Sequence, residues 1–251
     1  MNVALYGIGG KRWTMTERGR AQMHRTATSL AIGPSALWWE GDALTIRVDE
    51  TAVPFPSRVS GMVRLYPAAI TDGVRVLDGG GRHRWWPIAP IARIDVAFDR
   101  PNLRWSGRGY LDCNFGDQPL EADFVRWDWC RACFDDRTAV LYDVTRRDGT
   151  DLSFAIQFDS AGNATDFLKP PAARLTPTVW GLKREARADP DRAATLVKTL
   201  EDAPFYARSI IDTHLLGQRT TAMHESLSLD RFRQPWVQLL LPFRMPRAWP
   251  K

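Results

Sequence analysis

Cysteine is scarce in this chain: its 251 residues include three, Cys113, Cys130 and Cys133. A small, odd number of cysteines argues against a scaffold held together by disulfides. Cys130 and Cys133 have the spacing of half a zinc site or of a redox pair, but no second pair of ligands follows at the required distance. We therefore interpret them as small hydrophobic residues and predict no metal site.

Long hydrophobic runs are also absent. The longest, residues 236–243, is interrupted by Gln238 and Pro242, whereas a membrane-spanning helix needs roughly 20 apolar residues. The first residues lack the charged start and apolar stretch of a secretory signal, so we expect none. Lysine supplies only five of the 34 basic residues, and the arginines that make up the rest are scattered. The net charge of +5 therefore does not form a block, and we predict no nucleic-acid partner.

Short segments of alternating apolar residues dominate what is present. They are residues 44–48, 62–66, 93–98, 139–144, 152–158 and 223–229, and they are punctuated by Gly41-Asp42, Asp72-Gly73, Asp78-Gly79 and Asp148-Gly149. This pattern predicts an antiparallel, all-β fold built from hairpins. We interpret the glycine cluster at residues 7–10 as another hairpin turn. One segment differs, because Asp189 and Pro190 are typical of a helix start, and residues 196–200 fit either its continuation or a strand.

Two stretches, residues 81–87 and 105–117, are dense in polar and aromatic side chains. Alternate residues of a strand share a face, so His83 and Trp85 point the same way. By the same rule Tyr110, Asp112 and Asn114 share a face. Polar side chains buried in an apolar protein need a partner or a purpose, which makes these residues candidates for catalysis. The alternative is that they face solvent or that Asp112 caps a turn.

Several separated stretches match a known family in the right order. They are residues 2–7, 12–19, 33–37, 81–90, 103–120, 126–129 and 224–232. Together they span nearly the whole chain, and in them the sequence resembles the bacterial acyclic carotenoid 1,2-hydratases, also called hydroxyneurosporene synthases.

The resemblance implies an all-β protein of two lipocalin-like antiparallel β-barrel or sandwich domains, expected at residues 1–122 and 123–251. It implies a hydro-lyase that adds water across the terminal C1=C2 bond of an acyclic carotene, such as neurosporene or lycopene, to give a tertiary alcohol without metal or organic cofactor. The family's proposed proton donor falls on Asp112, and its neighbouring positions important for activity fall on Tyr110, His83 and Trp85. We add Trp86, Asn114 and Trp105 as candidate substrate-binding residues.

The family also implies an N-terminal segment, rich in Trp and Tyr, before the position of Met1. We therefore expect the first domain to be incomplete and the reading frame to extend upstream. An in-frame stop codon just before Met1 would contradict this expectation.

An isolated alkene is a poor base, so its hydration needs a strong acid. An ordinary Asp has a pKa near 3.9, and burial raises such a value by as much as roughly 3–5 units. Our hypothesis is that Asp112 is protonated in an apolar pocket, is oriented by Tyr110, and delivers its proton to C2. The face of Trp85, with Trp86, would then stabilise the cation, and His83 or the Asp112 carboxylate would take the proton of the attacking water.

The substrate implied by the resemblance dissolves in membranes. The basic charge and the Trp- and Arg-bearing residues 230–251 are consistent with a peripheral position on a membrane surface, at its cytoplasmic side. The same tail fits equally well as a segment packed on the body of the protein. Two further functions remain open: a non-catalytic lipocalin-like carrier of an apolar ligand, and a carbohydrate-binding β-module whose tryptophans stack on sugars.

Overall fold

Antiparallel strands make up most of the chain, as the alternating sequence pattern predicts. The computed structural model describes residues 1–251 except 8–10, 54, 246 and 249–251. By their contacts, the residues form two compact units, one of residues 1–68, 92–110 and 238–251 and one of residues 69–91 and 111–237. Each unit combines segments that are distant in sequence, because the long strands β10 (His83–Arg100) and β11 (Leu103–Gly116) run through both. The expected division at residue 122 stays a prediction.

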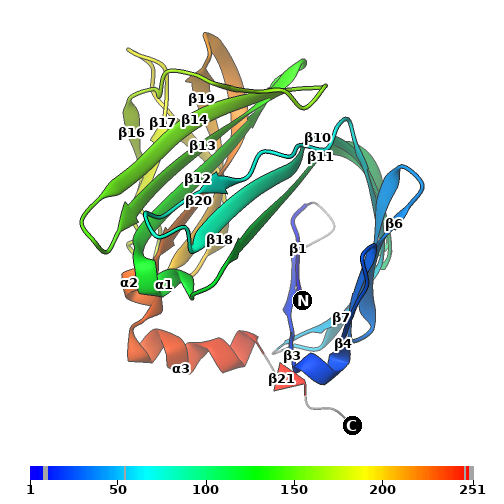
Figure 1. Cartoon of the computed structure of the whole chain (residues 1–251). Coiled ribbons are helices and arrows are strands. Elements are labelled where there is room, and N and C mark those ends of the chain that lie inside the picture. The colour runs from blue at the N-terminus through cyan, green and yellow to red at the C-terminus, as the bar shows by residue number, and fades with distance from the viewer. Residues whose placement is uncertain (8–10, 54, 246, 249–251) are drawn as a thin grey trace. The chain divides into compact units, whose positions relative to one another are not determined.

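The first unit is built on a meander of antiparallel strands (Figure 1). Its elements are β1 (Asn2–Leu5), β2 (Arg12–Met15), β3 (Glu17–Arg18), the 3₁₀ turn Arg20–Gln22, β4 (Met23–Arg25), β5 (Ser29–Ile32), β6 (Ser35–Glu40), β7 (Ala43–Ala52), β8 (Ser57–Pro67) and β21 (Arg247–Ala248). Strands β4 to β8 pair in sequence order, and β8 pairs with the second half of β10. Val48, Val59, Val96 and Phe98 form its buried core.

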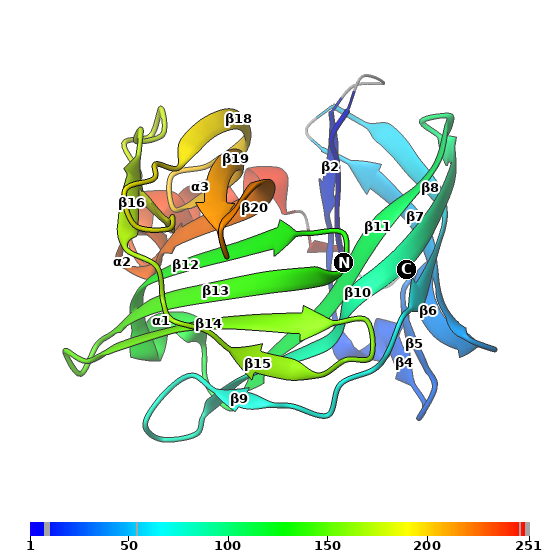
Figure 2. The same ribbon diagram turned by 90° about the horizontal axis from the view of Figure 1, so that it is seen from above.

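The second unit holds a seven-stranded sheet in the order β15-β14-β13-β12-β20-β19-β18 (Figure 2). Its elements are β9 (Arg75–Val76), α1 (Leu120–Asp123), β12 (Phe124–Cys133), β13 (Arg137–Arg146), β14 (Asp151–Asp159), β15 (Ala164–Asp166), β16 (Ala172–Leu175), β17 (Arg184–Arg187), β18 (Thr195–Asp202), β19 (Tyr206–Leu215), β20 (Gln218–Ser228) and α2 (Leu229–Phe232). Strands β16 and β17 form a separate hairpin, and the core contains Leu141, Ile211 and Leu215. Helix α3 (Pro235–Arg244) follows α2; its first three residues belong to the second unit and the rest to the first.

Five of the six predicted strands lie within observed strands, and the sixth, residues 223–229, extends one residue past the end of β20 at Ser228. Most predicted turns are confirmed. Gly41 and Gly149 have φ angles of 63° and 85°, a left-handed conformation that favours glycine, and they connect β6 to β7 and β13 to β14. Asp78-Gly79 lies between β9 and β10, which pair with each other. The hairpin expected at Asp72-Gly73 is wrong: these residues lie in the long connection from β8 to β9, strands that each pair with β10 instead.

The helix expected from Asp189 is also wrong, and residues 195–202 form strand β18. The Asp189 carboxylate accepts hydrogen bonds from the backbone N–H groups of Leu216 and Gly217. It therefore caps the turn between β19 and β20 rather than the start of a helix. Pairing with β19 supplies the backbone hydrogen bonds of β18, and this tertiary pairing overrides the local helix signal.

Three smaller expectations concern the N-terminal hairpin, the cysteines of β12 and the length of the helices. β1 pairs with β2, as a hairpin requires, but the turn itself includes residues 8–10, which lie outside the described residues. Cys130 is buried and Cys133 half-buried, and their spacing of three residues within β12 directs them to opposite faces. Among the helices within the described residues, none has the length and hydrophobicity needed to cross a bilayer.

Candidate active site

Strands β10 and β11 bring two of the predicted residues, Trp85 and Asp112, into direct contact within the second unit. The indole Nε1–H of Trp85 donates a hydrogen bond of 2.8 Å to Oδ2 of Asp112. Trp85 is completely buried, whereas Asp112 is half-buried. One oxygen of the carboxyl group is therefore held by a rigid, buried donor.

Aromatic rings from the seven-stranded sheet surround the Trp85 indole. The ring centroids of Tyr142, Phe154 and Phe158 lie 4.9, 5.7 and 6.5 Å from that of Trp85. Trp127 packs in turn against Tyr142 at 5.2 Å. These four residues come from β12, β13 and β14 and were not predicted, because the sequence does not reveal which distant strand faces β10. The packing fixes the indole, so its N–H is preorganised toward Asp112.

Tyr142 also extends the polar part of the site. Its hydroxyl donates a hydrogen bond of 3.2 Å to Oδ1 of Asn114, the exposed residue two positions after Asp112 on β11. Burial, and secondarily the nearby Asp112 carboxyl, raise the pKa of Tyr142 well above its usual value, against the opposing effect of the Asn114 hydrogen bond. Tyr142 therefore remains a neutral phenol that can donate this hydrogen bond.

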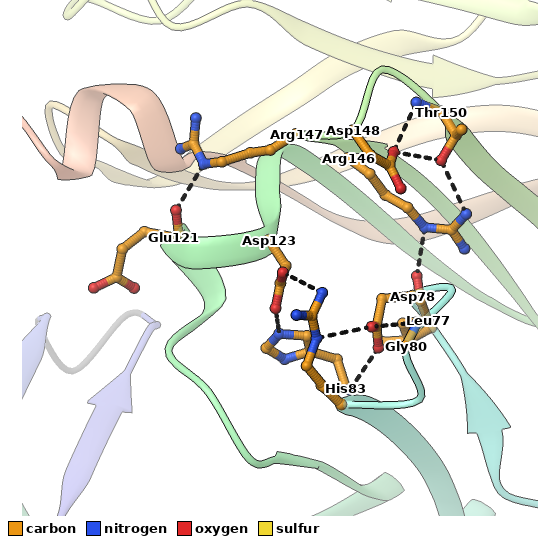
Figure 3. A network of polar contacts seen from close by, with 11 residues as sticks. Leu77, Asp78, Gly80, His83, Glu121, Asp123, Arg146, Arg147, Asp148 and Thr150 are labelled. Carbon is orange, nitrogen blue, oxygen red and sulfur yellow. Dashed lines mark hydrogen bonds and ion pairs between the residues drawn. The ribbon is translucent and has the colours of Figure 1, made fainter.

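His83 shares the buried face of β10 with Trp85 but belongs to a different network (Figure 3). Its Nε2 lies 2.7 Å from Oδ2 of Asp123 in α1, and its backbone N–H donates to Asp78 at 2.7 Å. Arg82 donates to the other oxygen of Asp123 at 2.6 Å. These contacts tie the start of β10 to α1. Gly116 belongs to the same junction, because a Cβ there would lie 2.3 Å from the carbonyl oxygen of Arg82.

We expect the substitution His83→Ala to act mainly on stability. It leaves the largely buried Asp123 without one of its partners, and we expect a loss of about 2–3 kcal/mol in the free energy of unfolding. Turnover per folded molecule should fall less than on removal of the Asp112 carboxyl. Urea unfolding and turnover measured on the same preparation test this. Unchanged stability with complete loss of turnover would contradict it.

The other three predicted residues, Trp86, Tyr110 and Trp105, have different surroundings. Trp86 points to the opposite face of β10 from Trp85, and its Nε1–H donates to the carbonyl of Thr71 at 2.7 Å. Tyr110 is half-buried on β11 and belongs to the first unit. Trp105, which is 45% exposed, lines a depression of about 430 Å³ in the first unit. Their roles in substrate binding stay predictions.

A second buried polar cluster joins two of the stretches that carried the family resemblance. Asp128 on β12 lies opposite Ser226 on β20, whose hydroxyl donates to it at 2.5 Å. Arg126 Nε lies 2.6 Å from the same carboxylate, and His224 Nε2 lies 3.8 Å from it. His224 Nε2 is also 3.0 Å from the carbonyl of Glu185. Asp128 thus links two motifs whose roles the sequence left unassigned.

The environment shifts the pKa values of Asp128 and His224 in opposite directions. Burial raises the pKa of Asp128 to about 6, although the charge of Arg126 and hydrogen bonds from Ser226, Arg126 and the backbone of Glu185 oppose the shift. Burial, with the charges of Arg184 and Arg126, lowers the pKa of His224 to about 4, against the Glu185 carbonyl and the charge of Glu225.

These shifts predict a pH dependence of stability. Between about pH 4 and 6, Asp128 in the folded protein holds a proton that it has lost in the unfolded chain. Its contribution to the free energy of unfolding therefore falls as the pH rises. In the folded protein His224 lacks a proton that the same side chain binds in the unfolded chain up to its ordinary pKa of 6.5. The contribution of His224 to the free energy of unfolding therefore rises with pH over nearly the same range. Relative to wild type, Asp128→Asn should gain about 2–3 kcal/mol in free energy of unfolding from pH 4 to 7.

Urea unfolding at several pH values measures this difference. The mirror-image control is His224→Gln, whose stability relative to wild type should fall with rising pH in the same window. If the stability of both variants relative to wild type changed with pH in the same way, Asp128 and His224 would keep their ordinary pKa values in the folded protein.

The fold resembles that of a solved protein of very different sequence. The crystal structure of a putative AttH from Nitrosomonas europaea superimposes with a TM-score of 0.56 at 13% sequence identity, covering 83% of this chain and 72% of that one. At this level of identity the likeness concerns the fold alone. It confirms the expected all-β, lipocalin-like architecture.

Sequence comparisons identify the family. An acyclic carotenoid 1,2-hydratase of Thiocapsa roseopersicina is 54% identical over 99% of this chain, and one of Rubrivivax gelatinosus is 48% identical over 98%. The chain spans 62% and 61% of the length of these two relatives. The profile of the family described as carotenoid hydratase CrtC matches residues 1–250. These matches confirm the resemblance found in the separated motifs, and the chain belongs to the carotenoid hydratase CrtC family.

Proposed function

We propose that this protein is a hydro-lyase that adds water across the terminal C1=C2 bond of acyclic carotenes such as neurosporene and lycopene, with Asp112 as the acid. The observation that carries the proposal is the hydrogen bond from the buried Trp85 indole to Asp112, in a chain of the carotenoid hydratase family. A carrier of the same fold has no need of a carboxyl group aligned in this way.

The reaction starts with transfer of the Asp112 proton to C2. The alkene π electrons form the new C2–H bond as the carboxyl O–H bond breaks, and positive charge develops on the tertiary carbon C1. A water molecule then bonds to C1 through its oxygen. The oxonium formed returns a proton to the Asp112 carboxylate, which restores the acid and leaves a tertiary alcohol. No redox step is required.

The structure supports a positioning role for Trp85 and a different role for His83 from the one we expected. Tyr142, Phe154 and Phe158 pack against the Trp85 ring, so we assign this residue to holding Asp112 through its N–H. That hydrogen bond strengthens as the carboxyl becomes a carboxylate, which favours proton delivery. His83 is engaged with Asp123, so we assign the return of the proton to Asp112. Asn114, exposed beside Asp112, is the proposed contact for the substrate end or water.

The substitution Trp85→Phe tests this positioning role. It keeps an aromatic ring in the cluster and removes the indole N–H that donates to Asp112. Hydrogen bonds to charged groups contribute about 1.5–3 kcal/mol, so kcat should fall about 10- to 150-fold while KM changes little. Initial rates over a range of carotene concentrations separate the two constants. A rise in KM at constant kcat would instead place Trp85 among the residues that bind the substrate.

The proposed function is tested by incubating the purified chain with detergent-dispersed lycopene and separating the pigments by chromatography with mass detection. We expect a more polar pigment heavier by one water. Pigment that is bound but recovered unchanged would support the carrier function. Absence of any bound pigment, together with binding to polysaccharide, would support the carbohydrate-binding function.

A further inference from the structure

One face of helix α3 carries a stripe of large apolar side chains that are exposed to solvent. Trp236, Leu239, Leu240 and Phe243 are 45%, 72%, 44% and 71% exposed. Their spacing of i, i+3, i+4 and i+7 places all four on one face of the helix. An ordinary surface helix turns such a face toward the core. In α3 that role belongs to Val237, which is buried.

A loop of the second unit lies against the start of this helix. The loop between β16 and β17 carries Val179, which is almost fully exposed, and Trp180, whose ring stacks on that of Trp236 at 6.1 Å. Hydrogen bonds hold the loop backbone: Arg231 donates to the carbonyl of Trp180 at 2.6 Å, and Val179 N–H donates to Asp202 at 2.8 Å. The exposed side chains are therefore presented by a fixed backbone. We call Trp236, Leu239, Leu240 and Phe243, the four exposed residues on this face of α3, the apolar stripe.

The segment that carries the apolar stripe is predominantly basic. Residues 229–251 contain five basic residues and one acidic residue, Asp230. The Asp230 carboxylate is neutralised by Arg147 at 2.7 Å, and Arg233 is exposed. A segment that combines exposed Trp, Leu and Phe with basic residues is complementary to a surface that is apolar beneath and negatively charged above. The interface of an anionic lipid bilayer has this composition.

We propose that the apolar stripe docks this protein on anionic membranes, with its side chains inserted at the level of the lipid headgroups. Tryptophan favours that depth because its ring is apolar and its N–H is polar. The proposal gives the stripe a purpose that rests on the proposed function: a hydrocarbon substrate dissolves in the bilayer, and a docked enzyme meets it there. A second copy of this chain is the competing occupant, and the test distinguishes the two.

The test is co-flotation of the purified chain with vesicles that contain no carotenoid, made either of phosphatidylcholine alone or of phosphatidylcholine with phosphatidylglycerol. We expect binding to the anionic vesicles, weakened by salt, and at least tenfold weaker binding to the neutral ones. The double variant Leu239→Glu/Phe243→Glu should lower the partition coefficient at least tenfold, because two apolar anchors are replaced by charges. The matched control is Leu168→Glu, a single such replacement at a residue 91% exposed outside the stripe, which should bind like wild type.

Two results would overturn the proposal. One is equal binding of wild type and the double variant to anionic vesicles. The other is a wild-type dimer in light scattering that the double variant converts to monomer, with no vesicle binding by either, which would assign the stripe to self-association. Because the vesicles hold no carotenoid, the outcome does not depend on hydration. A chain that docks but fails to convert lycopene would contradict the proposed function and leave the docking surface standing.

Discussion

Asp112→Asn should abolish detectable hydration of lycopene while the protein stays folded. The amide has nearly the shape of the carboxyl group and can still accept the hydrogen bond from Trp85, but it carries no acidic proton for C2. General acid–base catalysis is typically worth about 10²–10⁴-fold. We expect the upper end of this range, because water alone is far too weak an acid to protonate an isolated alkene.

Two comparisons make the result specific. Asp117→Asn introduces the same chemical change five residues further along the chain, where the side chain is 73% exposed and lies 3.9 Å from Arg84, and it should keep wild-type turnover. Unfolding midpoints in urea should agree between both variants and wild type. A folded Asp112→Asn protein with wild-type turnover would remove Asp112 from the mechanism and leave the acid to be found elsewhere.

The faces of the strands could be predicted from the sequence, but their partners could not. Alternation along a strand depends only on neighbouring residues, so the burial of both His83 and Trp85 follows from the parity of β10. Which residues meet them depends on pairing between segments far apart in the chain. Asp123 is 40 residues from His83, and Ser226 is 98 residues from Asp128. No local pattern encodes those separations.

The same reason explains the error at Asp189. Its position before a proline is locally typical of a helix start, yet its carboxylate binds backbone N–H groups 27 and 28 residues away. Tyr142 shows how such a residue could have been found. It is a polar aromatic residue in the largely apolar stretch 139–144, and a buried hydroxyl needs a partner. That signal predicts that Tyr142 contacts a polar group, although not that the group is Asn114.

In the first unit, we expect Arg18→Met to destabilise the protein by about 3–5 kcal/mol. The side chain of Glu50 on β7 is completely inaccessible, and Arg18 holds both of its oxygens, at 3.0 and 2.7 Å. Ser35 donates to the same carboxylate at 2.6 Å. Hydroxyl donors alone do not compensate a buried charge, so removal of the guanidinium leaves a desolvated carboxylate that the fold must accommodate. Urea unfolding, with amide exchange followed in β7, measures the loss.

The adjacent residue of β7 provides the control. Asp49 points to the opposite face and pairs with Arg58 at 2.6 Å, but both side chains are substantially exposed, so Arg58→Met should cost less than about 1 kcal/mol. The double variant Arg18→Met/Glu50→Gln should recover much of the loss of Arg18→Met, because no charge then remains buried. Equal costs for Arg18→Met and Arg58→Met would mean that water reaches Glu50 and that this ion pair contributes no more than one at the surface.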